Sequence, residues 1–469
     1  MKLKRFMKKN VTVLFFISCF KLFSQTPVVL WEQEFGELES IFYNILKTNN
    51  GEFILSGGYY PSAVVSGGLT VRIDTNNQLI WENNNLQIGI PKGIVQQSDD
   101  YIYSVKYSNP PNTSTFSLFQ YNNDGVLLNQ WSYPHSDVLY ITKLVATQDG
   151  GFLISGHKTT PDSPYSRNGW IAKLNASKVI EWEREISSAD AIQLQTATQT
   201  TDGNFLVAGH KEYNTGTSDF YLAKLNTLGN LIWEKEYGGS VDEDVWAVTE
   251  LVNGNYIFAG ASTSFDGDVS NNSGEINVWT IITDTNGNLL SEQIITNGFW
   301  AFTESSIIAE PDGGYTIGTM SDCSESYSMQ HFNIQRFNAA NENIWNLCLA
   351  EGNLLDLVKT DDDGYIAVGV NVLSSGNQAY AIKIGVVLDN ESFALQNTSF
   401  YPNPVKDILY IKSDIVFNHV IIYTVDGRKV MREQIQNNQI NVEKLPQNLY
   451  IAKLVTENEQ EVNLKFVKN

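Results

Sequence analysis

The chain has 469 residues, enough for two or three domains of ordinary size or for one large repeat domain with a small companion. It carries 31 basic and 52 acidic side chains and a formal net charge of −21. Such an acidic chain is repelled by phosphate backbones, so no nucleic-acid partner is expected. The acidity suits solubility outside the cell; a surface for cations or for a basic partner is the alternative.

Residues 1–24 are predicted to form a secretory signal peptide. Basic residues between positions 2 and 9 precede a short apolar stretch at 11–20, and a polar segment follows. The apolar stretch is shorter than the roughly 20 residues of a membrane-spanning helix, and cleavage is expected after Ser24. The alternative is that Cys19 accepts a lipid. No later segment is long and apolar enough to span a bilayer, so no transmembrane segment is expected in the mature protein.

Removal of the signal peptide makes the remaining chain more acidic. Residues 1–24 carry six basic and no acidic side chains, so the net charge becomes −27. Residues 391–469 carry nine acids and nine bases, and the whole excess of negative charge therefore lies in residues 25–390. The character of the chain changes near residue 390, where we expect a domain boundary.

Internal repeats dominate residues 25–390. One half of each repeat is an Asp-Gly or Asn-Gly turn, an aromatic residue, an apolar run and a glycine, as in DGGFLISGH from Asp149. A weaker copy, SDDYIYSVK from Ser98, lacks the glycines. The aromatic residues follow one another 48 to 59 positions apart and are Phe53, Tyr101, Phe152, Phe205, Tyr256, Tyr315 and Tyr365.

The other half of the repeat is a strand, a polar turn and a second strand that ends in tryptophan, as in YLAKLNTLGNLIW. In four repeats an apolar residue before Asp or Asn precedes this tryptophan by eight positions. These tryptophans are Trp81, Trp182, Trp233 and Trp345. The repeat near 121 places its tryptophan at Trp131, and the repeat near 283 has Ser291 instead.

Each repeat is predicted to form three or four short strands. Turns rich in Asp, Asn and Gly are typical of hairpins, and flanks rich in Phe, Tyr, Ile, Val and Leu are typical of strands. No segment of the mature chain shows a sustained helical period. One such sheet cannot bury its own faces, so the sheets must stack on one another. The expected fold class is therefore all-β, either a propeller or an open solenoid.

The ends of the repeat region decide between these two folds. The last repeat stops at Leu388 without its tryptophan strand, whereas VLWEQEFG at 29–36 is such a strand without a repeat before it. Counting Trp31, the region has seven turn halves and seven closing strands. A ring that takes its last strand from the N-terminus leaves no exposed sheet edge. We therefore predict that residues 25–390 form a seven-bladed β-propeller closed by the N-terminal strand.

Two cysteines remain after the signal peptide, Cys323 and Cys348, both in one repeat. An exported chain permits a disulfide between them, and two separate buried thiols are the alternative. No Cys-x-x-Cys pair occurs, so zinc and redox motifs have no support.

Residues 391–469 are predicted to form a small Ig-like antiparallel β-sandwich. Apolar residues alternate at 408–411 and 420–423, and Asp426-Gly427 is typical of a hairpin turn. Strands are also expected at 449–454 and 462–466. Prolines at 402 and 404 lie in the linker that leads into this domain.

This tail resembles the type A C-terminal sorting domain of the type IX secretion system (the Por secretion system) of Bacteroidetes, over residues 399–469. The residues that carry the resemblance are Tyr401, Pro402, Asn403, Pro404, Gly427, Leu449, Tyr450, Lys465 and Lys468. The family implies that the secretion machinery and its sortase recognise the tail. It further implies that the protein is secreted or attached to the outer surface of a Gram-negative cell. The repeats also resemble Asp-Gly-Gly-Tyr and Trp repeats common in exported proteins of the same bacteria, a resemblance that carries no activity.

Motifs for catalysis are missing from the sequence. His157 and His210 hold matching places in adjacent repeats, which indicates either a paired metal or proton-transfer site or shared ancestry of the repeats. No His-Glu-x-x-His motif, nucleophile elbow or phosphate-binding glycine loop occurs. The run Asp242-Glu243-Asp244 is expected to be a solvated loop, because a glycosidase needs two carboxylates separated across a sugar. No catalytic or cofactor-binding residue is identified, so the protein is not expected to be an enzyme.

One loop has the alternating oxygen donors of a calcium site. It departs from the EF-hand pattern, because its glycine comes early and no glutamate stands at the twelfth place; a polar loop explains it equally well. No cofactor is expected, with calcium as the alternative. The candidate ligands are Asp266, Asp268, Ser270, Asn272 and Glu275.

The tryptophans of the closing strands are expected to lock one blade to the next, as in the docking repeats of pyrroloquinoline-quinone enzymes, which they resemble. Four other tryptophans are expected in the blade cores, with stacking on sugar rings as the alternative. They are Trp170, Trp246, Trp279 and Trp300.

The sequence as a whole favours a monomeric, non-enzymatic binding or scaffold propeller whose ligand is a glycan or a protein. The alternative is a propeller enzyme that acts on polysaccharide, or a quinoprotein. The central funnel distinguishes the two: clustered carboxylates, a histidine or a metal there favour an enzyme, and a plain polar funnel favours binding.

Overall fold

The structure is a computed structural model that describes residues 26–62, 65–85, 89–98, 100–109, 113–160, 163–295, 306–321, 331–373, 376–385, 399–413, 416–424, 428–456 and 461–469. The predicted signal peptide lies outside these ranges. The chain divides into two compact units after Gly385. All regular structure in the described ranges is β, so they contain no helix that could cross a membrane.

The first unit begins with five antiparallel sheets of four consecutive strands. The first two sheets are β2 (Ser40–Lys47), β3 (Phe53–Ser62), β4 (Val65–Ile73) and β5 (Leu79–Asn85), then β6 (Pro91–Gln97), β7 (Asp100–Asn109), β8 (Thr113–Tyr121) and β9 (Leu127–His135). The third is β10 (Val138–Ala146), β11 (Phe152–Thr160), β12 (Ser163–Leu174) and β13 (Ile180–Ile186). The fourth and fifth are β14 (Ala191–Gln199), β15 (Phe205–Glu212), β16 (Ser218–Leu225) and β17 (Leu231–Tyr237), then β18 (Glu243–Glu250), β19 (Tyr256–Ser262), β20 (Asn277–Thr283) and β21 (Leu289–Ile294).

The remaining strands of this unit share one long strand. They are β22 (Ser306–Ala309), β23 (Tyr315–Ser321), β24 (His331–Phe337), β25 (Asn343–Lys359), β26 (Tyr365–Leu373), β27 (Gly376–Gly385) and β1 (Val28–Phe35), paired in that order. The first part of β25 pairs with β24, and residues 352–359 pair with β26. The N-terminal strand β1 is antiparallel to β27, from Val28 opposite Gly385 to Phe35 opposite Ala379.

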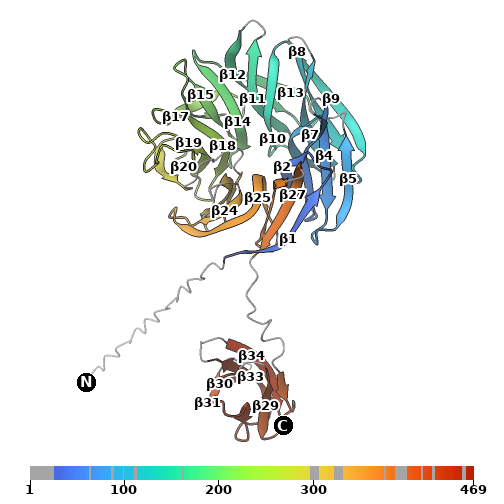
Figure 1. Ribbon diagram of the computed structural model, residues 1–469, viewed down its shortest axis with the longest axis vertical. Helices are drawn as coiled ribbons and strands as arrows, with labels where there is room; N and C mark the ends of the chain where they lie inside the picture. Colours follow the sequence, from blue (N-terminus) through green and yellow to red (C-terminus); the bar gives the residue numbers. More distant parts are fainter. Residues whose placement is uncertain are drawn as a thin grey trace, which may run out of the picture. The chain divides into compact units, whose positions relative to one another are not determined.

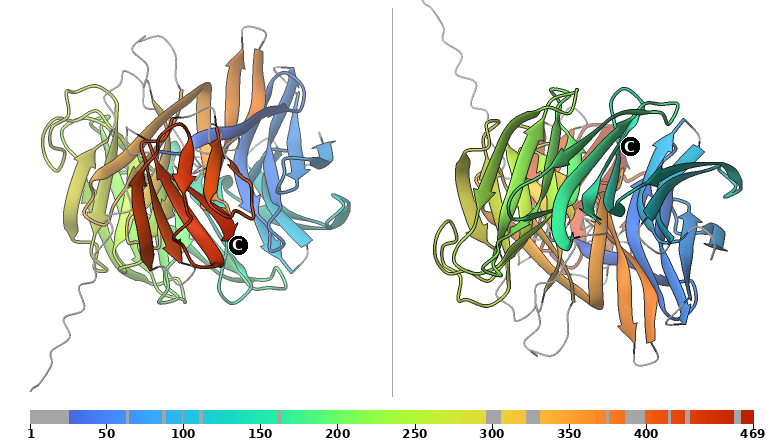
Figure 2. Two further views of the ribbon diagram at one scale, coloured as in Figure 1. Left: turned by 90° about the horizontal axis from the view of Figure 1, so that it is seen from below. Right: turned by 90° about the horizontal axis from the view of Figure 1, so that it is seen from above.

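The first strands of successive sheets contact one another. We call β2, β6, β10, β14, β18, β22 and β25 the inner strands. Each contacts the next in this order, and β25 contacts β2. In Figures 1 and 2 the sheets follow one another in chain order around the middle of the unit, and the orange strands of the last sheet lie beside the blue strands of the first. This arrangement of four-stranded sheets is consistent with a propeller.

The inner strands carry β-bulges at corresponding places. In β6 the register against the second strand shifts between Pro91 and Ile94. In five other inner strands a single residue lacks an opposite partner on the second strand. These residues are Tyr43, Thr142, Gln195, Trp246 and Leu355. A bulge inserts one extra residue, bends the strand and redirects a side chain.

The glycine of the repeat lies directly against the bulge. A Cβ atom added to this glycine would lie only 1.8–1.9 Å from a backbone oxygen of the inner strand, so no larger residue fits. This holds for Gly57, Gly156, Gly209, Gly260 and Gly369. The weaker second repeat has Val105 at this place and carries Gly93 on the inner strand instead, against Leu144 of the next sheet.

The tryptophans of the closing strands join each sheet to the next, as predicted. The indole N–H of Trp81 donates to the carbonyl of Asn123 at 2.8 Å, and that of Trp182 donates to Thr227 at 3.1 Å. Trp233 makes the same bond to Thr285 at 3.1 Å. Each acceptor lies in a turn whose glycine packs against the ring. The ring centres of Trp345 on β25 and Tyr365 on β26 lie 6.1 Å apart.

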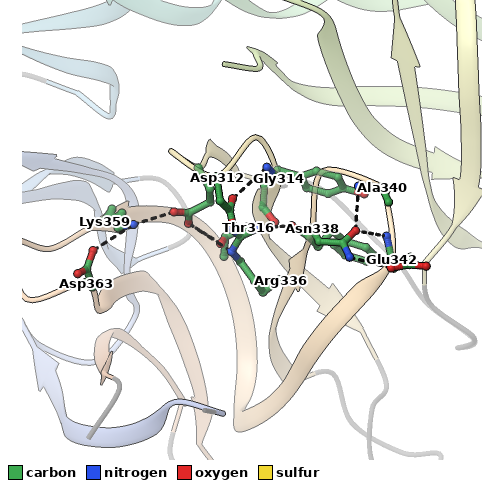
Figure 3. Close-up of polar contacts among 12 residues, drawn as sticks. Asp312, Gly314, Thr316, Arg336, Asn338, Ala340, Glu342, Lys359 and Asp363 are labelled. Carbon is green, nitrogen blue, oxygen red and sulfur yellow. Dashed lines mark hydrogen bonds and ion pairs between the residues drawn. The ribbon is translucent and has the colours of Figure 1, made fainter. Parts of the chain in front are cut away.

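A buried basic residue on the third strand holds the Asp-Gly turn of the same repeat. Lys173 and Lys224 contact Asp149 and Asp202, each at 2.8 Å. Figure 3 shows the equivalent contact of Arg336 with the turn residue Asp312, at 2.5 Å. The sequence analysis did not identify these basic residues.

This ion pair lowers the pKa of the aspartate in the turn. Burial favours the neutral carboxyl, but hydrogen bonds from Lys173 and Thr147 outweigh it and lower the pKa of Asp149 to about 2. The pKa values of Asp202 and Asp312 are lowered for the same reason.

The second unit is a small sandwich of two sheets, as predicted for the tail. One sheet has the order β28 (Ser399–Tyr401), β29 (Ile408–Lys412) and β32 (Gln439–Asn441). The other has the order β31 (Lys429–Gln434), β30 (His419–Thr424), β33 (Asn448–Val455) and β34 (Glu461–Lys468). Its core includes Leu409, Val420, Ile422 and Phe466, all with no exposed surface.

The close approach at the repeat glycine predicts that alanine destabilises the fold there much more than at a glycine away from the bulge. Gly156→Ala should lower the free energy of unfolding by about 1–3 kcal/mol, because its Cβ would lie 1.9 Å from the Tyr140 oxygen. Gly169→Ala, whose Cβ would meet only side-chain atoms, of Leu194 at 3.1 Å and Ile192 at 3.3 Å, is the matched control and should change it by less than about 1 kcal/mol. Urea unfolding of both variants measures this, and equal effects would contradict the role of the bulge.

The lowered pKa of Asp149 predicts acid sensitivity. A carboxyl with a folded-state pKa of about 2 stabilises the fold above its unfolded pKa of about 3.9, and this contribution is lost as the pH falls toward 2. Asp149→Asn should therefore be less stable than the parent at pH 6 and approach it between pH 4 and 2. Urea midpoints across this range measure the difference, with exposed Asp124→Asn as control. A constant difference would contradict the prediction.

Candidate functional site

A cavity of about 330 Å³ lies where the inner strands meet. All seven inner strands contribute to its lining. One residue from each, in chain order, is Tyr43, Lys92, Lys143, Gln195, Trp246, Ser306 and Asp356. The cavity therefore depends on every sheet of the first unit.

The bulges supply much of this lining. Each of the five residues that the register shifts leave without an opposite partner lines the cavity. Among them are the aromatic residues Tyr43 and Trp246. The sequence analysis named Trp246 with stacking on sugar rings as the alternative and missed the other four positions, although the repeat glycine on the second strand marks the bulge opposite each of them.

Two lysines lie on adjacent inner strands. A Cβ at Gly93, next to Lys92, would lie 2.7 Å from Cβ of Leu144, next to Lys143, so the backbones of β6 and β10 approach closely there. The Lys92 Nζ atom lies 5.1 Å from the ring centre of Tyr43, a cation–π distance. Neither lysine forms an ion pair with any part of the chain that the structure describes.

Asp356 is the one carboxylate among the described lining residues, and its oxygens are occupied. Oδ2 accepts a hydrogen bond from the Ile45 amide at 2.9 Å. Oδ1 accepts bonds from the Ser306 hydroxyl and the Leu357 amide, each at 2.9 Å. Asp356 thus joins β25 to β2 and β22. Its carboxylate serves to hold these inner strands together.

The predicted calcium ligands are turned toward different partners. Asp266 accepts a hydrogen bond from the Ser240 amide at 2.8 Å, and Asn272 accepts one from Asn277 at 2.7 Å. Asp268 and Ser270 bond to Gly238 and Glu292, and Glu275 bonds to Asn277 through its carbonyl. The described ranges hold no group of three or more His, Cys, Asp or Glu side chains that could bind a metal. Calcium binding stays a prediction that requires these contacts to rearrange.

The two histidines in matching places lie in separate sheets. The ring of His157 on β11 stacks on Tyr140 with ring centres 4.8 Å apart. The Nδ1 atom of His210 on β15 lies 2.7 Å from Asp244. The two histidines therefore have different neighbours at equivalent positions of the repeat.

The acidic run at 242–244 differs from the solvated loop that we expected. Glu243 begins β18 and has no exposed surface. It accepts hydrogen bonds from the Ser262 hydroxyl at 2.7 Å and the Gly239 amide at 2.8 Å. Its position inside a strand, which the run of acids concealed, explains the burial.

Cys348 lies on β25 and is disulfide-bonded. Its expected partner, Cys323, lies outside the described residues, so the pairing stays a prediction.

The four tryptophans away from the closing strands have two kinds of surroundings. Trp170 and Trp279 are buried in the sheet cores, as expected. Trp246 is half-buried and lines the cavity, where it can meet a ligand. Trp300 lies outside the described residues.

The predicted sorting residues include two parts of the tail that lie side by side. The segment at 401–404 (Tyr401, Pro402, Asn403 and Pro404) is exposed. The Asn403 side chain accepts a hydrogen bond from the Val467 amide at 2.8 Å and donates to the Lys465 carbonyl at 3.3 Å. The first motif of the tail is therefore fixed to its last strand.

The other sorting residues divide between core and surface. Tyr450 is buried and stacks on Phe466, with ring centres 5.5 Å apart. Leu449 is partly exposed, whereas Lys468 is buried. Gly427 lies outside the described residues.

Residues 399–469 match the family described as a secretion system C-terminal sorting domain. The tail is a sorting domain of the type IX secretion system. Such a domain implies secretion and attachment to the cell surface in Bacteroidetes. No curated protein sequence matches the chain.

Several solved structures are similar to the chain at low identity. PorZ of Porphyromonas gingivalis, described as an essential surface component of the type IX secretion system, is 11% identical with a TM-score of 0.40. The match covers 91% of this chain and 59% of PorZ, so the chain spans less than two thirds of that protein. A protein of unknown function from Dyadobacter fermentans is 10% identical, with a TM-score of 0.45 over 76% of this chain and 98% of that one. A putative 6-phosphogluconolactonase from Bacteroides fragilis is 12% identical, with a TM-score of 0.44 over 71% and 94%.

Proposed function

We propose that the protein is an exported seven-bladed β-propeller that binds a glycan or a protein at the cell surface without catalysing a reaction. The observation that carries this proposal is the cavity lined by all seven inner strands. Aromatic rings, two lysines and neutral polar groups line it. Asp356, the carboxylate among the described lining residues, accepts hydrogen bonds from three donors. Such a mixed aromatic and polar lining supports a binding role.

Closure of the ring by β1 is part of the proposal. The pairing of β1 with β27 and the contact of β25 with β2 support it. Further bonds join the ends of the unit: Asn77 of the first sheet donates to Gln33 of β1 at 2.7 Å, and the Ala379 amide donates to the Ser40 hydroxyl at 3.0 Å. The repeats also resemble the Asp-Gly-Gly-Tyr repeats of exported Bacteroidetes proteins.

Export proceeds in two steps in this proposal. The signal peptide at 1–24 directs the chain across the inner membrane, and the sorting domain directs it across the outer membrane. The mature protein is then released or attached to the surface as a monomer. The acidity of residues 25–390 suits this exposure to solvent.

One cluster favours the alternative of an enzyme on polysaccharide. A Cβ at Gly238 would lie 2.3 Å from an oxygen of Asp219 and 2.6 Å from one of Glu243, so two carboxylates converge there. Burial raises the pKa of Asp219, and the negative charge of Glu243 adds to this. However, Glu243 has no exposed surface and its oxygens are bonded within the fold, so we assign it a structural role.

Closure predicts a strong dependence of stability on the N-terminal strand. Deleting residues 25–38 should lower the melting temperature of the first unit by roughly 10 °C or more, because β27 loses its partner strand and the adjoining core loses Trp31. Deleting residues 399–469, which belong to the separate second unit, is the control and should leave this transition in place. An unchanged melting temperature after the N-terminal deletion would contradict closure.

The binding role is tested by a screen of the whole secreted chain against polysaccharides, with calcium and with chelator. Binding without shortened products is expected. Release of shortened sugars would contradict the non-enzymatic role and return attention to Asp219. Loss of binding with chelator would place calcium in the interaction, and binding to no glycan would leave a protein as the ligand.

A further inference from the structure

The lysines of the cavity stand out in a chain of net charge −21. The buried bases on the third strands, such as Lys173, Lys224 and Arg336, each contact a carboxylate. Lys92 and Lys143 have no such partner in the part of the chain that the structure describes, although both line a cavity. Two uncompensated ammonium groups in a confined space attract an anion more strongly than they would in bulk water.

Their placement allows both lysines to act on one group. They occupy adjacent inner strands, and Gly93 brings the two backbones together beside them. Asp356 cannot neutralise them at low cost, because its oxygens already accept bonds from three donors. Among the described residues, the lining therefore carries two positive side chains and one negative side chain in an otherwise acidic molecule.

The rest of the lining suits a sugar ring. The bulge of β18 places Trp246 in the wall, and Trp246 has no ring partner in the described ranges. An aromatic face packs well against the apolar face of a sugar, and indole is large and rigid. Gln195 adds an amide group for hydrogen bonds to sugar hydroxyls. The hydroxyls of Thr142 and Ser306 already donate within the fold, to Leu194 and Asp356, and offer acceptor oxygens. A volume of about 330 Å³ lies at the lower end of small-molecule sites, roughly 300–1,000 Å³, and suits a short or terminal sugar segment.

We propose that the cavity binds a carboxylate-bearing sugar, a uronic acid residue of an acidic glycan. Lys92 and Lys143 bind the carboxylate, and Trp246 contacts the sugar ring. This inference rests on the proposed binding function and gives it a ligand class.

The test uses the whole secreted chain and isothermal titration calorimetry. The probes are an oligogalacturonide, a neutral galacto-oligosaccharide of the same length, and inorganic sulfate. The variants are Lys92→Gln, Lys143→Gln and Trp246→Ala, with Lys235→Gln outside the cavity as the matched control for loss of one positive charge. Thermal melting confirms that each variant is folded.

The oligogalacturonide should bind at least about tenfold more tightly than the neutral sugar, and each cavity lysine variant should lose roughly tenfold of that affinity. Trp246→Ala should weaken both sugars, and Lys235→Gln should change neither. If both sugars bound with equal affinity and the lysine variants had no effect, the proposal of an anionic ligand would be wrong, whereas the proposed binding function would stand. If sulfate bound as tightly as the oligogalacturonide, the proposal that the cavity recognises a sugar would be wrong. Shortened products would instead contradict the proposed function, whatever the charge preference.

Discussion

The structure of the first unit depends on one close contact, between the repeat glycine of a second strand and a backbone oxygen of the inner strand. At 1.8–1.9 Å from a hypothetical Cβ, this contact excludes every residue except glycine in five of the sheets. It accompanies a bulge in the inner strand, and the bulge directs one side chain toward the middle of the unit. A feature that reads in the sequence as a simple strand glycine therefore determines what lines the cavity.

The charges of the unit serve two different purposes. At the turns, pairs such as Lys173 with Asp149 satisfy buried bases and fix the Asp-Gly hairpins. In the cavity, Asp356 accepts hydrogen bonds from the fold, whereas Lys92 and Lys143 form no ion pair with the described residues. The ion pairs at the turns thus stabilise the repeats, whereas we propose that the two lysine charges in the cavity bind a ligand.

Much of the architecture follows from the sequence because it is repeated. The turn halves and the tryptophans indicated short antiparallel strands, and the tail motifs indicated the sorting domain. The cavity could not be predicted in the same way, because Tyr43, Lys92 and Trp246 differ from repeat to repeat and meet only in three dimensions. Glu243 was misjudged for a related reason, since adjacent acids alternate between the two faces of a strand and one of them faces inward.

The most direct test of this account is an experimental structure of the protein soaked with an oligogalacturonide. The account predicts density for one sugar carboxylate within hydrogen-bond distance of the Nζ atoms of both Lys92 and Lys143, with a sugar ring against Trp246. Ligand density bound elsewhere, with the cavity lysines paired to carboxylates of the protein, would contradict it.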